Sequence, residues 1–411
     1  MENLLEHVWL PYTQMKTARQ PLQAVSTLGS VITLSDGREL IDGIASWWTA
    51  CHGYNHPHIV AALRAQLETM PHVMFGGLVH EPALKLAKRL ADKAPGDLSK
   101  VFFVDSGSVA IEVAMKMAVQ YWLNRGVSRS RMVSFRYGYH GDTMACMAVC
   151  DPDESMHALF KDYLPKQILA ELPVDEASTA EFDALLAREK HNVAAVLIEP
   201  LVQGAGGMKM HDATTLRKVA EICRKHEVLL IADEIFVGFG RTGTFFACEQ
   251  AGVVPDILCV GKGLTGGALT LAAAIARPHV YDAFLSDDPT HALMHGPTYM
   301  ANPLACAAAN ASLDLFETEP RLKQVAAIEL LLREGLEPCR TLPGVLDVRV
   351  KGAIGAVQLE TVDAPALREK FAERGFWVRP FGDIVYLTPA FTIEERQLNA
   401  LTAAIREVLK R

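Results

Sequence analysis

The chain has 411 residues, half of them apolar and 21% charged, which is an ordinary composition for a globular protein. A chain of this length is too long for one small core and predicts two domains, or one large domain and one smaller. The formal net charge of −8 and the lack of a lysine- and arginine-rich run argue against a nucleic-acid partner.

The N-terminal stretch, MENLLEHVWLPYTQMK, carries acidic residues early and lacks the charged-then-apolar pattern of a secretion signal. No apolar run approaches the roughly 18 residues that a membrane span requires. The eight cysteines form no C-x-x-C pair, and most lie among apolar residues, which favours buried free thiols over disulfides or zinc ligands. These features predict a cytoplasmic protein with no membrane contact and no metal site.

In chain order, the first pattern is VITLSDGRELIDG, which predicts two short strands at 31–43 around an S-D-G-R turn. Such a hairpin is not stable alone, so residues 1–50 are expected to pack against another part of the chain. From about residue 100, short apolar runs alternate with helical patterns. The runs lie at 101–104, 131–135, 194–200, 228–234, 256–260 and 271–276. Several are continuously apolar, which predicts an α/β domain at about 50–315 with a largely parallel sheet.

Residues 316–411 predict a separate α+β unit. Its helical patterns lie at 321–338, 365–375 and 393–411, and its strand patterns at 345–350 and 353–360. The stretches 377–382 and 384–389 are typical of a hairpin-like pair of strands.

Polar residues follow four of the predicted strands, where ligands of open α/β sheets bind. Asp105-Ser106-Gly107-Ser108 opens a helix, and its N–H groups suit a phosphate, although a plain serine N-cap explains the same pattern. Tyr139 and His140 follow the strand at 131–135. An aromatic side chain there could stack on a flat ring or serve packing alone.

Asp233 and Lys262 end the two strands that follow. A carboxylate at the end of a buried strand needs a partner, such as a protonated ring nitrogen of a ligand; alternatively, Asp233 pairs with Arg241 or caps a turn. Burial among glycines lowers the pKa of a lysine and makes its amine nucleophilic, unless Lys262 extends to solvent. A phosphate cradle, a ring face, an acid for a ring nitrogen and a reactive amine together match the requirements of pyridoxal 5′-phosphate.

The pattern G-x-G-x-x-G occurs twice, at 238–243 and 261–266. Neither copy lies tightly between a strand and a long helix with an acid ending the next strand. A nicotinamide oxidoreductase is therefore the weaker interpretation.

The stretch LLIADEIFVGFGRTGTFFACEQAGVVPDILCVGKGLTGG, at 229–267, resembles the signature of the class III aminotransferases. The resemblance extends over nearly the whole chain. It implies the fold-type-I architecture, with a large domain on a mainly parallel sheet and a small α+β domain built from both chain ends. It also implies pyridoxal phosphate as cofactor and a homodimer whose active sites lie at the subunit interface.

Other stretches resemble the branch of this family that aminates 8-amino-7-oxononanoate with S-adenosylmethionine as donor, in biotin synthesis. They lie at 42–57, 72–80, 103–122, 137–157, 294–313 and 377–382. Two alternatives stay open. Lysine could be the donor instead. Alternatively, the chain could be another class III aminotransferase, one that acts on an ω-amino acid or a diamine.

The resemblance also implies the role of each site residue. Lys262 binds the cofactor aldehyde, Asp233 pairs with the pyridine nitrogen, and Tyr139 lies by the ring; these three are the expected catalytic residues. The phosphate is expected to contact Gly107 and Ser108, with Pro297 and Thr298 reaching it from the partner subunit.

The residues expected at the substrates are Tyr12, Trp47, Tyr139, Asp142, Lys262, Gly296 and Arg379. Arg379 is expected to bind the acceptor carboxylate through its planar guanidinium. Asp142 would repel a carboxylate and suit a cationic donor such as a sulfonium. Tyr137, Phe236 and Val237 depart from the family pattern and are expected near these contacts but outside them.

Overall fold

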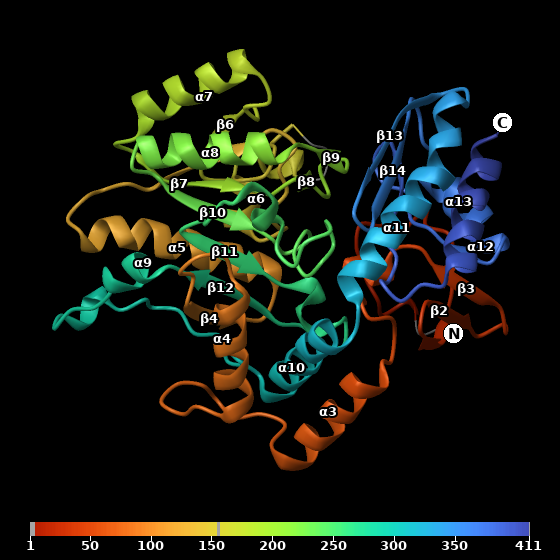
Figure 1. Cartoon of the computed structure of the whole chain (residues 1–411), viewed down its shortest axis with the longest axis horizontal. Coiled ribbons are helices and arrows are strands. Elements are labelled where there is room, and N and C mark those ends of the chain that lie inside the picture. Colours follow the sequence, from red (N-terminus) through yellow and green to blue (C-terminus); the bar gives the residue numbers. More distant parts are fainter. Residues whose placement is uncertain (1–4, 154–156, 411) are drawn as a thin grey trace.

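The computed structural model describes residues 5–153 and 157–410, so parts of the N-terminal stretch and of the motif at 137–157 lie outside the described residues. Its largest element is a seven-stranded sheet with the order β4-β12-β11-β10-β7-β5-β6 (Figure 1). The strands are β4 (Lys100–Val104), β5 (Arg131–Phe135), β6 (Ile168–Ala170), β7 (Val193–Ile198), β10 (Leu229–Asp233), β11 (Ile257–Val260) and β12 (Ala272–Ala276). Only β12 runs antiparallel to its neighbours. The predicted α/β domain with a largely parallel sheet is confirmed.

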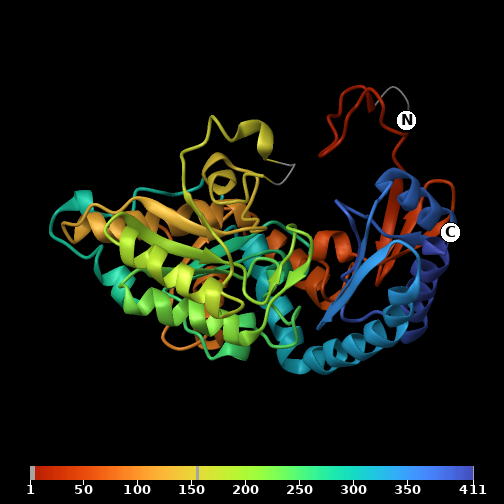
Figure 2. The same ribbon diagram turned by 90° about the horizontal axis from the view of Figure 1, so that it is seen from above.

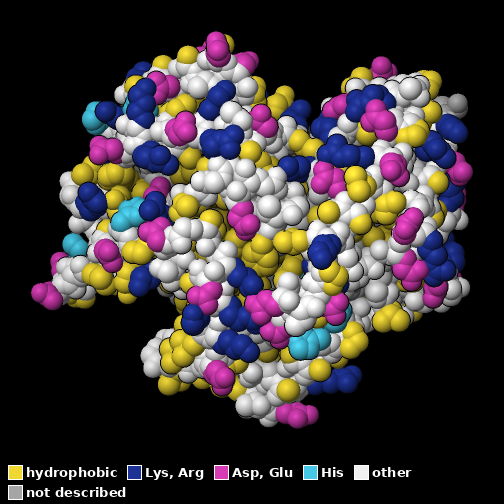
Figure 3. All heavy atoms as spheres, viewed as in Figure 1, with side chains coloured by type: hydrophobic (Ala, Val, Ile, Leu, Met, Phe, Trp, Pro, Cys, Tyr) yellow, Lys and Arg dark blue, Asp and Glu magenta, His cyan; other side chains and the backbone are white. Residues whose placement is uncertain are grey.

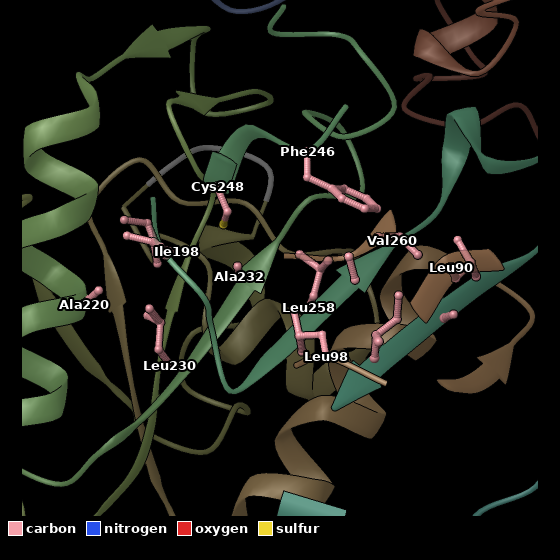
Figure 4. Close-up of a cluster of buried hydrophobic side chains, with 14 of the residues drawn as sticks. Leu90, Leu98, Ile198, Ala220, Leu230, Ala232, Phe246, Cys248, Leu258 and Val260 are labelled. Carbon is pink, nitrogen blue, oxygen red and sulfur yellow. The ribbon is translucent and has the colours of Figure 1, made fainter. Parts of the chain in front are cut away.

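Both faces of this sheet are covered, which explains the continuously apolar strands. In β10, Leu230 and Ala232 join a core with residues of α4 (Glu81–Lys93) and α8 (Ala213–Lys225), shown in Figure 4. Their neighbours Leu229 and Ile231 join a second core, with residues of α5 (Gly107–Asn124). Because successive strand residues point to opposite faces, each strand must be apolar at every position.

The other helices and short strands of this large unit precede, connect or follow the sheet strands along the chain. They are α2 (Ala45–Trp48), α3 (Pro57–Thr69), α6 (Met144–Ala148), α7 (Glu176–Glu189), α9 (Pro278–Asp282), α10 (Pro303–Thr318), η1 (Ala158–Phe160), η2 (Ala247–Ala251), η3 (Lys262–Thr265), η4 (Pro289–His291), β8 (Val202–Gln203) and β9 (Lys209–Met210).

A small unit combines both chain ends, as the resemblance implied. Its elements are β1 (Ala24–Leu28), β2 (Val31–Leu34), β3 (Glu39–Asp42), α11 (Arg321–Leu336), η5 (Glu337–Thr341), β13 (Val345–Lys351), β14 (Ile354–Leu359), α12 (Ala364–Glu373), β15 (Phe376–Trp377), β16 (Ile384–Leu387) and α13 (Glu395–Leu409). The N-terminal hairpin is stabilised by β15, which pairs in parallel with β3. The domain limits at 50 and 315 stay predictions.

The predicted hairpin of 377–382 and 384–389 is wrong. Its first strand, β15, extends the sheet β1-β2-β3, whereas β16 joins β13 and β14 in another sheet. Between them only an isolated bridge forms, from Phe381 to Ile384. Pro380 has no N–H to donate to a ladder, which favours a change of sheet at this point.

All eight cysteines are free thiols and buried, as their apolar surroundings predicted. Within residues 5–153 and 157–410, no helix combines the length and apolar character that a membrane crossing requires. The same residues hold no group of three or more histidines, cysteines and carboxylates placed to hold a metal ion. On the face shown in Figure 3, basic and acidic side chains are interspersed.

Candidate active site

A cavity of about 1680 Å³ is lined by residues of both units. Its wall includes the N-terminal segment, the loop after β5, α12 and the turn after β15. In Figure 2 the N-terminal segment and the loops between β5 and β6 extend to the same side of the molecule. Five of the predicted site residues line this cavity, namely Tyr12, Trp47, Tyr139, Lys262 and Arg379.

Lys262 lies at the end of β11, at the first position of η3, and is partly buried. Its amine lies 4.4 Å from the centre of the Trp48 ring and 5.8 Å from that of Phe236. Burial lowers the pKa of Lys262 to about 8, although the charges of Asp233 and Glu199 act in the opposite direction. The side chain therefore faces the cavity with an appreciable neutral fraction at neutral pH, and does not extend to bulk solvent.

This lowered pKa gives a testable pH dependence. A neutral amine attacks aldehydes, so the reaction of Lys262 should rise with pH through about 8 and then level off. At pH 7 its neutral fraction should exceed that of an exposed lysine by roughly two orders of magnitude. Reductive methylation of the cofactor-free chain, followed by peptide mass spectrometry from pH 6 to 10, measures this. Exposed Lys88 provides the internal reference for access of the reagent, and a midpoint for Lys262 near the ordinary lysine value of about 10.4 would refute the environment described.

Asp233 ends β10 in a buried position and is paired with His140. Its Oδ2 lies 2.8 Å from His140 Nδ1, and its Oδ1 accepts the backbone N–H of Ile235 at 3.1 Å. Burial opposes protonation of His140, but the hydrogen bond and charge of Asp233 prevail and raise the pKa of the imidazole. Arg241 donates instead to the carbonyls of Ala353 and Pro389, so the alternative pairing of Asp233 with Arg241 is wrong.

Glu199 is a second buried carboxylate that we did not assign from the sequence. It follows β7, and its two oxygens accept the N–H groups of Tyr139 and Gly204, each at 2.9 Å. Burial raises the pKa of Glu199 to about 7. The position of Glu199 directly after a fully apolar strand was the signal that could have identified it. For His140, the signal was its position next to Tyr139 after β5.

Asp142, which does not itself line the cavity, joins two phenols of the cavity wall. Tyr139 donates its hydroxyl to Oδ1 of Asp142 at 2.7 Å, and Tyr12 donates to Oδ2. Burial and the Asp142 charge raise the pKa of Tyr12 to about 12 and that of Tyr139 well above its usual range. The Tyr139 ring also stacks on His157, with centroids 5.9 Å apart. Both phenols therefore stay protonated and hold the exposed carboxylate in place.

The N-terminus of α5 has the features of an anion site. The Ser106 side chain caps the helix, as the alternative interpretation held. Within the described residues, the N–H groups of Gly107 and Ser108 nevertheless have no acceptor. A Cβ at Gly107 would lie 2.9 Å from Ile235, and one at Gly141 only 2.3 Å from Ser108 Oγ. Two glycines thus allow the backbone to approach closely at this end of the site.

Trp47 and Trp48 occupy an unusual turn. The four residues from Ala45 to Trp48 have φ values of 45°, 47°, 54° and 74°, a left-handed conformation that costs each residue roughly 1–2 kcal/mol. Buried Asp42 stabilises it by accepting the N–H groups of Ile44 and Ser46, at 2.8 and 2.9 Å. Trp48 packs in the core on Phe236, whereas Trp47 is 38% exposed; both line the cavity.

Arg379 lies over the face of Trp47, with its guanidinium carbon 4.6 Å from the ring centre. Burial lowers the pKa of this arginine. The charged and polar groups that act on it are Tyr386, Arg368 and Tyr12. Within the described residues, then, no carboxylate pairs with Arg379, and its fork remains available to a ligand.

Gly296, Pro297 and Thr298 are not brought into this cavity by their own chain. Gly296 and Thr298 are exposed in the loop before α10, and none of the three lines the cavity. Two of the sequence departures lie closer to the site than expected: Tyr137 lines the cavity, and Phe236 supports both Trp48 and Lys262. Val237 is fully buried in an apolar cluster.

Known proteins are similar to this chain in sequence and in architecture. Residues 13–409 match the family described as Aminotransferase class-III. The adenosylmethionine-8-amino-7-oxononanoate aminotransferase of Mycobacterium leprae is 47% identical, over 98% of this chain and 94% of the relative. The crystal structure of the enzyme of that name from Methanocaldococcus jannaschii has a TM-score of 0.95 at 33% identity, covering 100% of this chain and 99% of the other. A PLP-bound amine transaminase from an uncultivated Pseudomonas species has a TM-score of 0.90 at 31% identity, covering 98% of each chain.

Proposed function

The chain belongs to the class III aminotransferases, and we propose that it transfers the amino group of S-adenosylmethionine to 8-amino-7-oxononanoate. The product is 7,8-diaminononanoate, in biotin synthesis. The observation that supports this most directly is one cavity lined by both Lys262 and Arg379, an arginine that pairs with no carboxylate of residues 5–153 and 157–410. Eight free, buried thiols are consistent with a place in the reducing cytoplasm.

The residues present fit pyridoxal phosphate. Lys262 offers a partly neutral amine and Asp233 a buried carboxylate supported by His140. At the N-terminus of α5, beside two glycines, lie N–H groups that have no acceptor in the described part of the chain. When bound, the cofactor supplies an aldehyde that takes up an amino group and a ring that accepts electrons. Lys262, Asp233 and Tyr139 would hold its aldehyde, ring nitrogen and ring face, and Gly107 and Ser108 its phosphate.

The side chains around the cofactor site have separate roles in proton transfer and in positioning. Lys262, with a pKa near 8, can take a proton from the donor carbon and return it, since its pKa is close to the working pH. Asp233 would hold the ring nitrogen of the cofactor and favour its protonated form, and His140 orients that carboxylate through the hydrogen bond between Nδ1 and Oδ2. Glu199 holds the backbone of Tyr139 and so fixes the ring beside the reacting groups.

Substrate recognition is proposed to use the residues around the cavity mouth. Arg379 receives the distant carboxylate of 8-amino-7-oxononanoate in a bidentate contact. Asp142, with its two phenols, attracts the cationic sulfonium of the donor, while Tyr12 and Trp47 shape the space between. Gly296 borders the same space from the partner subunit.

A donor and acceptor screen tests this proposal. Purified protein loaded with cofactor is mixed with one donor at a time, and the spectral change of the first half-reaction is followed. S-adenosylmethionine should react faster than lysine, 4-aminobutyrate or ornithine, and 8-amino-7-oxononanoate should complete the cycle. If lysine reacted faster, only the assignment of the donor would change. If 4-aminobutyrate or ornithine reacted faster, the chain would instead be an aminotransferase of another ω-amino acid or of a diamine.

Replacing Arg379 with alanine should affect the two half-reactions unequally. A charge-assisted contact is worth about 1.5–3 kcal/mol, so KM for 8-amino-7-oxononanoate should rise about ten- to a hundredfold. The donor half-reaction should change by less than about threefold, because the sulfonium donor is recognised at Asp142. Arg368→Ala, which removes a neighbouring cation of the cavity wall, is the matched control. If Arg379→Ala slowed both half-reactions equally, the assignment of Arg379 to the carboxylate of the acceptor would be wrong.

The active sites are proposed to be shared between two copies of the chain. Gly296, Pro297 and Thr298 lie at the surface, next to Met294 and Tyr299, which expose 77% and 58% of their areas. Exposed apolar side chains that lie together in one loop are consistent with a surface covered by another protein chain. In a two-fold dimer, this loop would reach the partner's phosphate site.

Mixing two inactive variants tests the shared site. Lys262→Ala and Thr298→Asp are each expected to be inactive, the second because its charge repels phosphate. After unfolding and refolding together, half of the dimers are mixed and each has one intact site, so about a quarter of wild-type activity should return. If Thr298 served the site of its own chain, no mixed dimer would have an intact site and activity would stay absent.

A further inference from the structure

A buried line of polar side chains runs from the start of the small unit to the turn of the proposed catalytic lysine. Its members are Arg321 on α11, His52 in the loop after α2, and Ser312 on α10, which are 3%, 2% and 0% exposed. Arg321 Nε lies 3.0 Å from His52 Nδ1, His52 Nε2 lies 3.0 Å from Ser312 Oγ, and Ser312 Oγ lies 3.4 Å from the carbonyl oxygen of Gly263. None of these three side chains lines the cavity.

The chemistry of these groups gives the line one direction. A guanidinium can only donate, so His52 Nδ1 must be the acceptor. Burial and the positive charge of Arg321 lower the pKa of His52 to about 3, which keeps the ring neutral with its proton on Nε2. His52 therefore donates to Ser312, and the hydroxyl of Ser312 is left to donate to Gly263. Donation by Arg321 to His52 thus sets the direction of the other two hydrogen bonds of the line.

The end of the line is a place where the backbone needs support. Lys262 has a φ of +42°, in the left-handed region that a residue with a Cβ adopts at a cost of about 1–3 kcal/mol. Such a conformation persists only where its surroundings over-determine it. The carbonyl of Gly263, the next residue, is held by Ser312, by the thiol of Cys51 at 3.6 Å and by the N–H of Gly266 at 3.0 Å.

We propose that Arg321, His52 and Ser312 form a positioning relay that holds the turn of Lys262, and so directs its amine into the cavity. Because α11 continues from α10 into the small unit (Figure 1), the relay also ties the position of the lysine to that unit. The relay rests on the proposed function only for the role of Lys262. It does not depend on which donor or acceptor is used.

Two pairs of variants test the relay in the full chain. His52→Phe keeps a ring of similar shape but removes both nitrogens, whereas His52→Gln keeps one acceptor and one donor at similar spacing. Ser312→Ala removes only the hydroxyl at the end of the line. Cys306→Ala is its control, since it truncates another buried side chain of α10 that takes no part in the relay.

Each variant is measured in three ways: the midpoint pH of Lys262 methylation in the cofactor-free chain, the pH dependence of the bound cofactor's absorption, and kcat and KM. His52→Phe and Ser312→Ala should raise the methylation midpoint by about one unit or more, because a released amine moves into a wetter position. They should lower kcat by about ten- to a hundredfold with little change in KM. His52→Gln and Cys306→Ala should stay close to wild type.

The relay is wrong if His52→Phe and Ser312→Ala leave both the methylation midpoint and kcat unchanged. It is equally wrong if activity falls in all four variants while the midpoint stays near its wild-type value, because that pattern means a general loss of packing. Should His52→Phe fail to fold, Ser312→Ala decides alone. The methylation midpoint is independent of any substrate, so a wrong substrate assignment would leave this test intact.

Discussion

Replacing Lys262 with alanine is expected to abolish transamination, lowering kcat by roughly 10⁴-fold or more. The reason is that one side chain would serve two purposes, as the amine that binds the cofactor and as the group that moves the proton. The variant should still bind pyridoxal phosphate without a covalent bond, through the N-terminus of α5 and the acid of Asp233.

The same substitution should not harm the fold. Lys262 contributes no hydrogen bond to the described part of the chain, and removal of a partly buried amine from an apolar setting relieves a desolvation cost. Thermal unfolding should therefore occur at or above the wild-type temperature. Lys209→Ala is the matched control, because it removes another lysine of the cavity wall, whose amine lies over the Tyr137 ring. Turnover near wild type in Lys262→Ala would overturn the assignment of the site.

Replacing Asp233 with asparagine is expected to lower kcat by about 10²–10³-fold in both half-reactions, with the cofactor still bound. A neutral amide cannot keep a proton on the ring nitrogen, so the ring becomes a poorer acceptor of electrons. His140 also loses the charge that raises its pKa, and its ring should become neutral. The absorption spectrum of the bound cofactor should change its pH dependence accordingly.

The neighbouring acid provides a close comparison. Glu234 is also buried, but its oxygens accept the N–H groups of Ala247 and Cys248, away from the cavity lining. Glu234→Gln should therefore lower the melting temperature without changing kcat per folded molecule. If Asp233→Asn behaved in the same way, with normal kcat and only reduced stability, Asp233 would be a structural residue.

The sequence by itself determined the main sheet and the two residues at the centre of the proposed chemistry. The six predicted runs became β4, β5, β7, β10, β11 and β12, and several of them are continuously apolar because both faces of the sheet are covered; β6 was not predicted. Asp233 and Lys262 could be identified for a related reason. A charged residue at the end of such a strand has to be stabilised by a partner or a ligand, and this requirement can be read along the chain.

Only the tertiary structure decided which polar groups meet. Asp233 pairs with His140, 93 residues away, rather than with Arg241, eight residues away. Glu199 holds Tyr139, and Asp42 stabilises the left-handed turn that presents Trp47 to the cavity. Periodicity reports whether a side chain is buried, but it carries no information about a partner on a different strand.

The same limit explains the wrong hairpin prediction in the C-terminal region. Local patterning at 377–382 and 384–389 describes two short extended segments equally well in one sheet or in two. Which sheet β15 joins depends on β3, which lies more than three hundred residues earlier and pairs with Phe376 and Trp377. A short strand gains little from its own turn and more from a neighbouring strand that leaves an edge unpaired, so its place depends on the assembled fold.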